Sequence, residues 1–579
     1  MFKDYRIEFF KYFIKDKKLF FKYFFLSFIV GGLELFGVAL TYPFIYRLLS
    51  NQKLDATALF FGLLIVIAFL AKNMFMIFYN SLQADFTKNS EAYINKKFMQ
   101  FFLYGDYNVI SNLSLSKKHQ ITGFLIPTCI NNYLLRILNL IVNLFIFLLI
   151  IGFLFAKFFV ATCITLVCSI ILLFAETIYF KYKTKVFSKK ISKAQEELGH
   201  ASNIPLLNLK SVKIINNEDF FFENYCEKFD KTQQLSKDLF FYNSIPPYVT
   251  EPFIIIILLV LLTIISLQHQ SESSILVASY AVVVSATFRL APTISRIQVN
   301  ITGINSCLTQ VKELVQLYKE FRLNEFSPKI LTFNEFKNSL EFKNVSFAYS
   351  EKNVLNNINL KINKGDFIGI AGTSGIGKTT LVDIIAGLLK IDSGEIYINN
   401  KLLEKNETLK LKIGYIPQEY NTISASIREN VAFGNRNIDD EKVIEALKLA
   451  QLYDFIIDNY KDGIYSEPFT DSIGFSQGQK QRLAIARALY LDPDIIILDE
   501  ATSSLDLKTE NEICEILHKL KGEKTIIAIA HRISTIKDAD KIFLMQNSTI
   551  VAQGNFNELY SSNTDFKNLV ELNNANSIH

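Results

Sequence analysis

A glycine-rich run occupies residues 372–380 and has the sequence GTSGIGKTT. It matches the pattern Gly-x-x-x-x-Gly-Lys-Thr, follows the apolar run DFIGIA and opens a helix-like stretch. Glycines allow the backbone to curl so that its N–H groups point at phosphate oxygens, and a helix N-terminus adds favourable positive charge. We expect Lys378 to reach the β- and γ-phosphates of a nucleoside triphosphate and Thr379 to bind Mg²⁺. The predicted phosphate cradle comprises Gly372, Thr373, Ser374, Gly375, Ile376, Gly377, Lys378, Thr379 and Thr380.

Two acidic residues, Asp499 and Glu500, end the apolar run IIILDE. A buried strand has no structural need for adjacent carboxylates at its tip, whereas Mg²⁺ binding and water activation both use them. We therefore assign Asp499 to the Mg²⁺ shell and Glu500 to polarising the attacking water.

Three further side chains are candidates for the same site. Gln418, in YIPQEY, lies 40 residues beyond Lys378 (418 − 378) and is predicted to join the metal and water network. His531 follows the strand-like run TIIAIA and is a candidate contact of the γ-phosphate, although such a residue taken alone is more often an ordinary histidine at a loop edge. Tyr349 is a candidate for stacking on a nucleobase, although a tyrosine at the edge of a core is the commoner alternative.

A second phosphate-binding feature lies in the run GFSQGQKQRLAIARAL, residues 474–489. A serine hydroxyl and free N–H groups directly before a long helix are able to hold a phosphate at the positive helix end. The chain therefore carries two phosphate-binding features, whereas a single nucleotide needs one phosphate loop. The residues of this second feature are Ser476, Gln477, Gly478 and Gln479.

The composition indicates a membrane protein. Half of the 579 residues are hydrophobic, and the mean hydropathy of +0.22 is high for a soluble chain. The net charge of +5 is too small to suggest a nucleic-acid partner, and six scattered cysteines without metal spacing suggest neither zinc nor disulfides. Six apolar segments are each long enough to cross ~30 Å of hydrocarbon as a helix. They lie at about 19–46, 57–80, 134–155, 158–181, 252–268 and 274–294.

The distribution of basic residues predicts the orientation. The two short connections between spans contain one lysine, whereas the N-terminus and the long connections at 82–131 and 182–250 are rich in lysine and arginine. By the positive-inside rule, both termini and both long connections are cytoplasmic. The long connections have helix-like periodicity, so we expect the helices to continue beyond the bilayer. Residues 1–22 carry seven basic residues among aromatic ones, which predicts an amphipathic helix on the inner membrane surface.

Several ionisable residues fall inside or at the edges of the predicted spans. For any one of them, pairing between helices or snorkelling to the headgroups is the favoured explanation. Arg289 and Arg296 are seven positions apart and so share one face of the last helix, where they are able to attract an anionic head group such as phosphate or pyrophosphate. The full set is Glu34, Lys72, Arg136, Glu176, Glu251, Arg289 and Arg296.

The composition changes in the second half of the chain. Residues 311–338 are charged and indicate a connecting helix and linker. Beyond them, short runs rich in isoleucine and valine alternate with helix-like stretches, which predicts an α/β domain with a largely buried parallel sheet. We therefore predict a multi-domain membrane protein with a six-helix, all-α transmembrane domain over residues 1–310. An α/β P-loop nucleotide-binding domain follows over residues 339–579.

These motifs in this order, together with SSLD at 503–506, resemble the ATP-binding cassette of the ABC transporters. The six preceding spans with long loops resemble a half-transporter of the type I ABC exporters. The resemblance implies an ATPase coupled to transport, ATP and Mg²⁺ as cofactors, and Asp506 as a further nucleotide-site residue. In that family ATP lies between the phosphate loop of one cassette and the Ser-x-Gly-Gln run of the other. The resemblance therefore also implies a homodimer with two equivalent sites.

Two features depart from the commonest family pattern. The usual Leu-Ser-Gly-Gly-Gln signature has Phe475 and Gln477 in its first and third places here, and the phenylalanine keeps an apolar anchor. The preceding segment, SEPFTDSIG at 466–474, lacks the glycine-rich acidic pattern usual in exporters. Neither departure affects the expected ATP chemistry.

The substrate is indicated by a narrower resemblance. LELFGVALTYPFI in the first span and FRLAPTISRI in the last are similar to bacterial ABC flippases of lipid-linked oligosaccharides. This implies a lipid-linked glycan substrate, membrane lipids as partners, no nucleic acid, and a multi-pass location in the bacterial inner membrane. Arg289 and Arg296 are then the candidate contacts of the substrate pyrophosphate. An exporter of lipid A, phospholipid or hydrophobic drugs and an ATP-dependent gate that transports nothing remain as alternatives.

Overall fold

The computed structural model divides into two compact units, residues 1–105 with 109–328 and residues 329–579 with 106–108. Each unit has its own buried core. The residues that the structure describes are 2–14, 17–50, 56–157, 159–268, 273–323, 334–349, 352–404, 409–418, 420–468, 475–500, 507–529 and 532–576.

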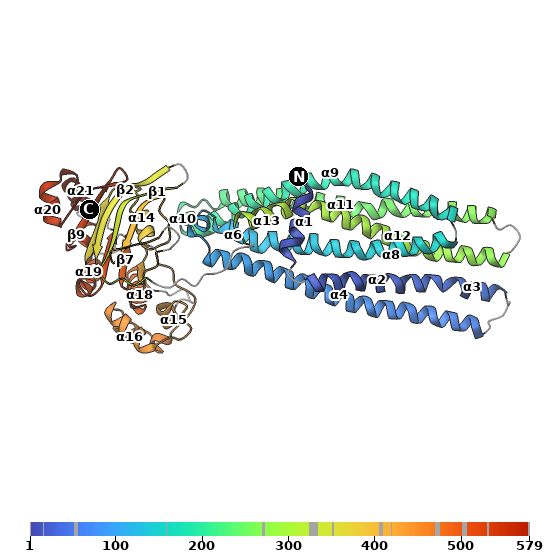
Figure 1. The fold of residues 1–579 in the computed structure, drawn as a ribbon, viewed down its shortest axis with the longest axis horizontal. Helices are drawn as coiled ribbons and strands as arrows, with labels where there is room; N and C mark the ends of the chain where they lie inside the picture. The colour runs from blue at the N-terminus through green and yellow to red at the C-terminus, as the bar shows by residue number, and fades with distance from the viewer. Residues whose placement is uncertain are drawn as a thin grey trace. The chain divides into compact units, whose positions relative to one another are not determined.

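The first unit is a bundle of helices, several of which run side by side over most of their length (Figure 1). Three of them contain 49, 49 and 51 residues, or about 75 Å each, so the expectation that the helices extend beyond a ~30 Å bilayer is confirmed. The helices are α1 (Phe2–Phe13), α2 (Lys17–Ala39), α3 (Thr41–Ser50), α4 (Ala56–Tyr104), α5 (Tyr107–Ser111), α6 (Leu115–Gln120), α7 (Ile126–Thr128), α8 (Leu135–Lys157), α9 (Phe159–Leu207), α10 (Leu209–Ile215), α11 (Glu218–Gln268), α12 (Ser273–Ser306) and α13 (Leu308–Glu320). Two π-helical segments, η1 (Ile121–Leu125) and η2 (Cys129–Leu134), flank α7.

Among the described residues, three helical segments are long and apolar enough to cross a membrane: Lys18–Leu48, Ala56–Tyr104 and Leu115–Ala156. They contain the first three expected spans. The expected spans at 158–181, 252–268 and 274–294 fall on α9, α11 and α12, where many side chains lie outside the described part of the chain, as residue 158 itself does.

The N-terminal segment differs from the expectation. Residues 1–22 do not form one helix, because α1 ends at Phe13 and α2 begins at Lys17. Phe9 and Phe13 are both buried. The ring centroid of Phe9 lies 5.1 Å from that of Tyr133, and the ring centroid of Phe13 lies 5.0 Å from that of Tyr318. The apolar face of α1 therefore packs on the bundle itself. An amphipathic pattern shows that one face needs an apolar neighbour but does not distinguish lipid from protein.

The second unit contains two sheets. A six-stranded sheet has the order β10-β9-β3-β8-β7-β6, in which all neighbours except β10 and β9 are parallel. A four-stranded antiparallel sheet has the order β2-β1-β4-β5. The strands are β1 (Ser339–Tyr349), β2 (Lys352–Asn363), β3 (Phe367–Gly372), β4 (Ser393–Ile398), β5 (Lys401–Leu402), β6 (Ile413–Ile416), β7 (Ile495–Asp499), β8 (Thr525–Ile529), β9 (Lys541–Gln546) and β10 (Thr549–Gly554).

The expectation of one parallel sheet is therefore only partly right. Strands β7 and β8 are buried at every position, as strands covered by helices on both faces are. Strand β1 mixes buried and exposed positions, as a strand with one solvated face does. The sequence contained this difference, since SLEFKNVSFAY alternates polar and apolar residues whereas IIILD does not.

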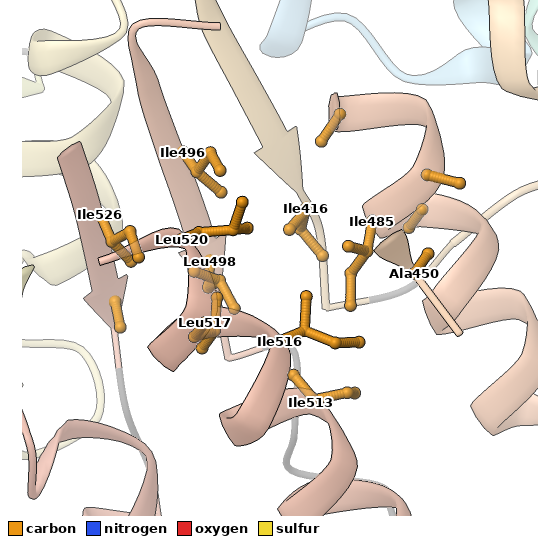
Figure 2. Close-up of a cluster of buried hydrophobic side chains, with 14 of the residues drawn as sticks. Ile416, Ala450, Ile485, Ile496, Leu498, Ile513, Ile516, Leu517, Leu520 and Ile526 are labelled. Carbon is orange, nitrogen blue, oxygen red and sulfur yellow. The ribbon is translucent and has the colours of Figure 1, made fainter. Parts of the chain in front are cut away.

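Side chains alternate across β7, and this alternation positions the acidic end of the strand. Ile496 and Leu498 point into a core with α19 (Leu507–Leu520) and α18 (Gln477–Tyr490) (Figure 2). Ile495 and Ile497 belong to the core on the opposite face, with α14 (Lys378–Ile385). By the same alternation Asp499 lies on the α14 face. The remaining helical segments are α15 (Ile427–Ala432), α16 (Asp440–Leu449), α17 (Tyr453–Asn459), η3 (Gly463–Tyr465), η4 (Ile533–Ile536), α20 (Phe556–Ser562) and α21 (Thr564–Asn576).

Candidate functional site

The glycine-rich loop joins the end of β3 to the start of α14, as its pattern predicts. Gly372, Gly375 and Gly377 have φ values of 155°, 78° and 106°, which curl the backbone in a way that other residues rarely adopt. A Cβ at Gly377 would also lie 2.9 Å from the carbonyl oxygen of Val354, so no larger residue fits there without movement. The loop is therefore shaped by its glycines before any ligand arrives.

Lys378 is the first residue of α14, and only 4% of it is exposed. Its Nζ donates to the carbonyl oxygens of Gly372, at 2.9 Å, and Thr373, at 3.1 Å, so the side chain folds back over the loop. Burial lowers the pKa of Lys378, while the neighbouring Glu500 and Asp499 carboxylates act in the opposite direction. The ammonium is thus held inside the loop, close to the acidic end of β7.

Asp499 is buried at the end of β7 and accepts a hydrogen bond from the Tyr415 hydroxyl at 2.8 Å. Burial raises the pKa of Asp499, and the Tyr415 hydrogen bond opposes this shift. Burial, with Asp499 adding to it, also raises the pKa of Asp383 on α14 from 3.8 to about 6. The site thus gathers carboxylates around one ammonium.

This arrangement fits Mg²⁺ held jointly with a nucleotide. Among the described residues, no group of three or more His, Cys, Asp or Glu side chains is close enough to hold a metal by itself. Mg²⁺ is usually bound by one or two carboxylates, with phosphate oxygens and water completing its shell. Asp499 beside the phosphate loop offers one such carboxylate, and Thr379 is exposed at the loop edge.

Glu500 follows β7 with a φ of 51°, in the left-handed region that residues other than glycine seldom occupy. Its N–H donates to the carbonyl oxygen of Ile529 at 3.1 Å, so β8 supports this conformation. A strained backbone at the tip of a buried strand is characteristic of functional sites. The bend separates the direction of Glu500 from that of Asp499.

The other expected residues of the nucleotide site are less constrained. Gln418 is exposed two residues beyond β6. Tyr349 ends β1 and is also exposed, with its ring edge-on to that of Phe347 at a centroid distance of 4.9 Å. His531 and Asp506 lie outside the residues that the structure describes.

The second phosphate-binding feature begins α18. Ser476 is the N-cap, and its hydroxyl accepts from the N–H of Gln479 at 3.3 Å while the Gln479 side chain accepts from the N–H of Ser476 at 2.7 Å. This capping box leaves Ser476 and Gln477 exposed at the helix start. The apolar anchor expected at Phe475 is confirmed, because its buried ring packs on Phe455 and Tyr460.

Sequence reasoning missed several residues that support the site. Tyr415 and Asp383 were recognisable only by their position, one on the strand leading to Gln418 and the other one turn along α14 from Thr379. Glu510, 2% exposed near the start of α19, accepts hydrogen bonds from Arg532 and Ser534. This contact joins the helix after Asp506 to the segment after His531, and no local sequence signal announces it.

The two arginines proposed for the substrate share α12 but have different surroundings. Arg296 lines a cavity of about 350 Å³ together with four asparagines: Asn80 of α4, Asn139 and Asn143 of α8, and Asn300 of α12. Arg289 is instead 3.1 Å from Glu34 and lies over the Phe69 ring at 4.5 Å. Arg289 therefore pairs between helices, which is the explanation favoured above for any single ionisable residue, and the substrate contacts of both arginines stay predictions.

A P-loop between β3 and α14, an acidic strand end beside it and an attached bundle of long helices define an ATP-driven membrane transporter. Residues 355–503 match the family model described as ABC transporter. Over 454 residues the chain is 31% identical to a "Putative export ATP-binding/permease protein" of Rickettsia conorii. The aligned region covers 72% of this chain and 76% of the relative. The chain belongs to the ABC transporters, as a half-transporter of the type I exporters, and is an ATPase coupled to transport with ATP and Mg²⁺ as cofactors.

Two further relatives each match less than half of this chain. The chain is 35% identical over 283 residues to a "Putative multidrug export ATP-binding/permease protein" of Bacillus subtilis, covering 47% of this chain and 49% of that one. It is 42% identical over 231 residues to the "Alpha-hemolysin translocation ATP-binding protein" of Escherichia coli, covering 39% and 33%. A solved structure titled as a bacterial Atm1-family ABC exporter with ATP bound has the same fold, with a TM-score of 0.80, 18% identity and coverage of 96% and 98%.

Proposed function

We propose that this exporter flips a lipid-linked oligosaccharide across the bacterial inner membrane, as a homodimer with both termini and the cassette in the cytoplasm. The observation that carries the proposal is the cavity between α4, α8, α11 and α12, whose lining contains four asparagines and Arg296. Asparagine amides donate and accept hydrogen bonds, as sugar hydroxyls do, and an arginine fork pairs with phosphate oxygens.

The burial of these amides supports a polar ligand. Asn143 and Asn300 are buried, and the Asn143 amide donates to the carbonyl oxygen of Asn139 at 2.7 Å. Asn139 in turn accepts from Gln83 at 2.9 Å, so the cavity wall is a connected polar network. Polar groups at membrane depth are costly and are kept where they line a pathway or a binding site. A glycan head with a phosphate-bearing attachment satisfies both the amides and the guanidinium.

The cassette residues divide the work of hydrolysis. Bound ATP would supply the scissile phosphate bond, and bound Mg²⁺ would neutralise charge on the phosphate oxygens. Lys378 holds phosphate charge, Glu500 accepts a proton from the attacking water, and His531 contacts the γ-phosphate. Mg²⁺ would be held by Thr379, Gln418 and Asp499. The nucleotide site would be completed by Tyr349, the loop 372–380, the partner copy's Ser476–Gln479 run and Asp506.

A second candidate is an exporter of lipid A, phospholipid or hydrophobic drugs. The same cavity is also lined by Met76, Tyr79, Val142 and Ile146, which offer apolar contact. A relative that matches part of this chain is named for multidrug export. This alternative uses the same cassette and differs only in what enters the cavity.

Translocation measured in proteoliposomes separates these candidates. The full-length protein is reconstituted with a fluorescent polyprenyl-pyrophosphate glycan, and ATP-dependent loss of access from one leaflet is followed. We expect transport of the glycan lipid by the native protein and none by Glu500→Gln. Movement of a labelled phospholipid or a hydrophobic dye without movement of the glycan lipid would select the second candidate.

A further inference from the structure

Three charged side chains from three helices meet beside the proposed cavity. Glu34 of α2 lies 2.8 Å from Lys72 of α4 and 3.1 Å from Arg289 of α12. The Glu34 side chain is 6% exposed, that of Lys72 17% and that of Arg289 36%. We call these three residues the span cluster. One nearly buried carboxylate therefore serves two cations.

The cluster is built into the packing of the helices. Arg289 lies over the face of Phe69, 4.5 Å from the ring centroid, and Phe69 precedes Lys72 by three residues on α4. A Cβ at Gly37 would lie 3.0 Å from the Phe69 ring, and Gly37 follows Glu34 by three residues on α2. Spacing of three places each pair on one helix face. Carboxylate, aromatic ring and guanidinium are thus held in one defined arrangement.

The charges of the cluster do not balance. Two cations and one carboxylate leave a formal charge of +1 between helices that cross the membrane. Uncompensated charge at this depth is costly and is normally matched by a partner or used at a substrate pathway. Arg289 is the more exposed of the two cations and keeps donors beyond the one nearest Glu34, because a guanidinium has five N–H groups. The cluster is therefore suited to receive one anionic group.

The cluster and the cavity lie in sequence along the same two helices. Arg289 precedes Arg296 by seven residues on α12, or about 10 Å of helix. Lys72 precedes Asn80 by eight residues on α4, or about 12 Å. On both helices the cluster residue is nearer to the helix N-terminus, Ala56 in α4 and Ser273 in α12, than the cavity residue is. The span cluster therefore lies between the cavity and these two helix ends.

We propose that Glu34 is an internal counter-ion that a phosphate group of the lipid substrate replaces at Arg289. The span cluster is then a second anion-binding station, reached after the Arg296 cavity. This inference rests on the proposed function, whose substrate carries phosphate next to its lipid chain. Glu34 sets how tightly the station holds that phosphate and so allows its release, because the carboxylate competes with the substrate for the same guanidinium.

The test uses a lipid without sugar. Full-length protein in phosphatidylcholine nanodiscs is titrated with a fluorescent polyprenyl phosphate, and the apparent dissociation constant is measured. Arg289→Gln is expected to weaken binding at least 10-fold and Lys72→Gln several-fold, because each removes attraction. Glu34→Gln is expected to tighten binding about 10-fold, because it removes the competing carboxylate. Glu8→Gln, which breaks the 2.6 Å pair with Lys319, is the matched control and should leave binding unchanged.

The opposite signs at Glu34 and Arg289 separate a ligand site from a structural ion pair. If Glu34→Gln weakens binding or leaves it unchanged, the cluster only holds helices together and the proposal is overturned. Arg289→Lys keeps the charge and is expected to retain binding within a few-fold. If Arg289→Lys loses binding as completely as Arg289→Gln does, the loss reflects disturbed packing around Arg289 and not the removal of its charge.

Two further arms identify the source of the phosphate and isolate the inference from the glycan proposal. Displacement of the probe by phosphatidylglycerol supports a lipid-borne phosphate, whereas displacement by inorganic pyrophosphate alone overturns it. If native protein fails to move the glycan lipid but the sugar-free probe shows the opposite signs, the glycan proposal fails and the station stands. If the glycan lipid moves and Glu34→Gln has no effect on probe binding, the station fails and the glycan proposal stands.

Discussion

The phosphate-loop region and the span cluster both bury charged side chains, but the excess charge has opposite sign. Around the loop, Lys378 lies near Asp499 and Glu500, and Asp499 lies near a third carboxylate, Asp383. In the span cluster, Glu34 is surrounded by Lys72 and Arg289. The first excess is negative and fits a divalent cation, while the second is positive and fits an anion. The sign of the unbalanced charge thus indicates the sign of the missing ligand.

The two regions also differ in how their groups are brought together. In the cassette, Asp499 ends β7, Glu500 follows it, and Lys378 and Asp383 lie on the helix that begins just after β3. Parallel strands place their carboxyl ends at one edge of the sheet. In the bundle, the three charges come from helices separated by long stretches of chain and meet only by packing. A motif is therefore visible in the first region and not in the second.

The largest expected effect comes from Glu500→Gln. A general base contributes about 10²–10⁴-fold to a rate, so we expect ATP turnover to fall by that order while ATP remains bound. Phosphate release by the full-length protein in proteoliposomes measures it, with the exposed Glu445→Gln as control. Undiminished turnover would remove Glu500 from catalysis. The same substitution at Glu34 is expected to strengthen ligand binding, which is the sharpest contrast between the regions.

The next effect concerns the support of the cassette site. Glu510→Gln replaces the buried carboxylate that accepts hydrogen bonds from Arg532 and Ser534 by a neutral amide. We expect the unfolding free energy of the cassette to fall by about 2–3 kcal/mol. Thermal unfolding in detergent measures this change against Glu515→Gln, an exposed position on the same helix. If both variants lower the unfolding free energy by the same amount, the buried contact of Glu510 does not stabilise the cassette more than an exposed glutamate does.

A smaller effect is expected in the cavity. Arg296→Gln replaces a charged donor by a neutral one, and we expect the concentration of glycan lipid for half-maximal ATPase stimulation to rise about 10-fold. Arg436→Gln, on an exposed loop of the cassette, is the control. If Arg296→Gln behaves as the control does, the cavity does not bind the phosphate of the substrate. The span cluster would then be the only proposed anion-binding site left to compare with the phosphate loop.

The smallest effect follows from the pKa of Asp383, which burial raises to about 6. The folded protein therefore binds this proton more tightly than the unfolded chain, so stability falls as pH rises from about 4 through 6. Asp383→Asn removes this loss. After allowance for partial exposure, we expect the variant to be more stable above pH 6 by about 1–2 kcal/mol.

Thermal unfolding without nucleotide, at pH 5 and pH 7.5, checks the sign. The exposed Asp454→Asn serves as control. A gain that is larger at pH 5 than at pH 7.5 would contradict the assignment.

Much of the cassette was predictable because its signals are local. The loop 372–380 specifies a strand, a curled turn and a helix within a few residues, and the acids of IIILDE stand next to each other. The separate antiparallel sheet was missed because strand pairing depends on contacts far apart in the sequence, although the alternation in β1 pointed to it. The hydrogen bond from Tyr415 to Asp499 spans 84 positions and has no local pattern at all.

In the bundle the sequence specified spans but not partners. Helical periodicity placed Arg289 and Arg296 on one face of α12, and it did so correctly as far as a single helix is concerned. Which neighbour each arginine meets depends on how α2, α4 and α8 pack against that face. The Glu34 carboxylate and the asparagine cavity therefore appeared only with the three-dimensional structure.

The sequence by itself determined the class of this protein, because phosphate binding requires glycines, a lysine and acids at fixed spacing and membrane crossing requires long apolar runs. The tertiary structure decided which charges are paired and which are left over. Helix packing sets these pairings through distances of a few ångströms between residues far apart in the chain, and electrostatic energy depends on those distances rather than on sequence separation.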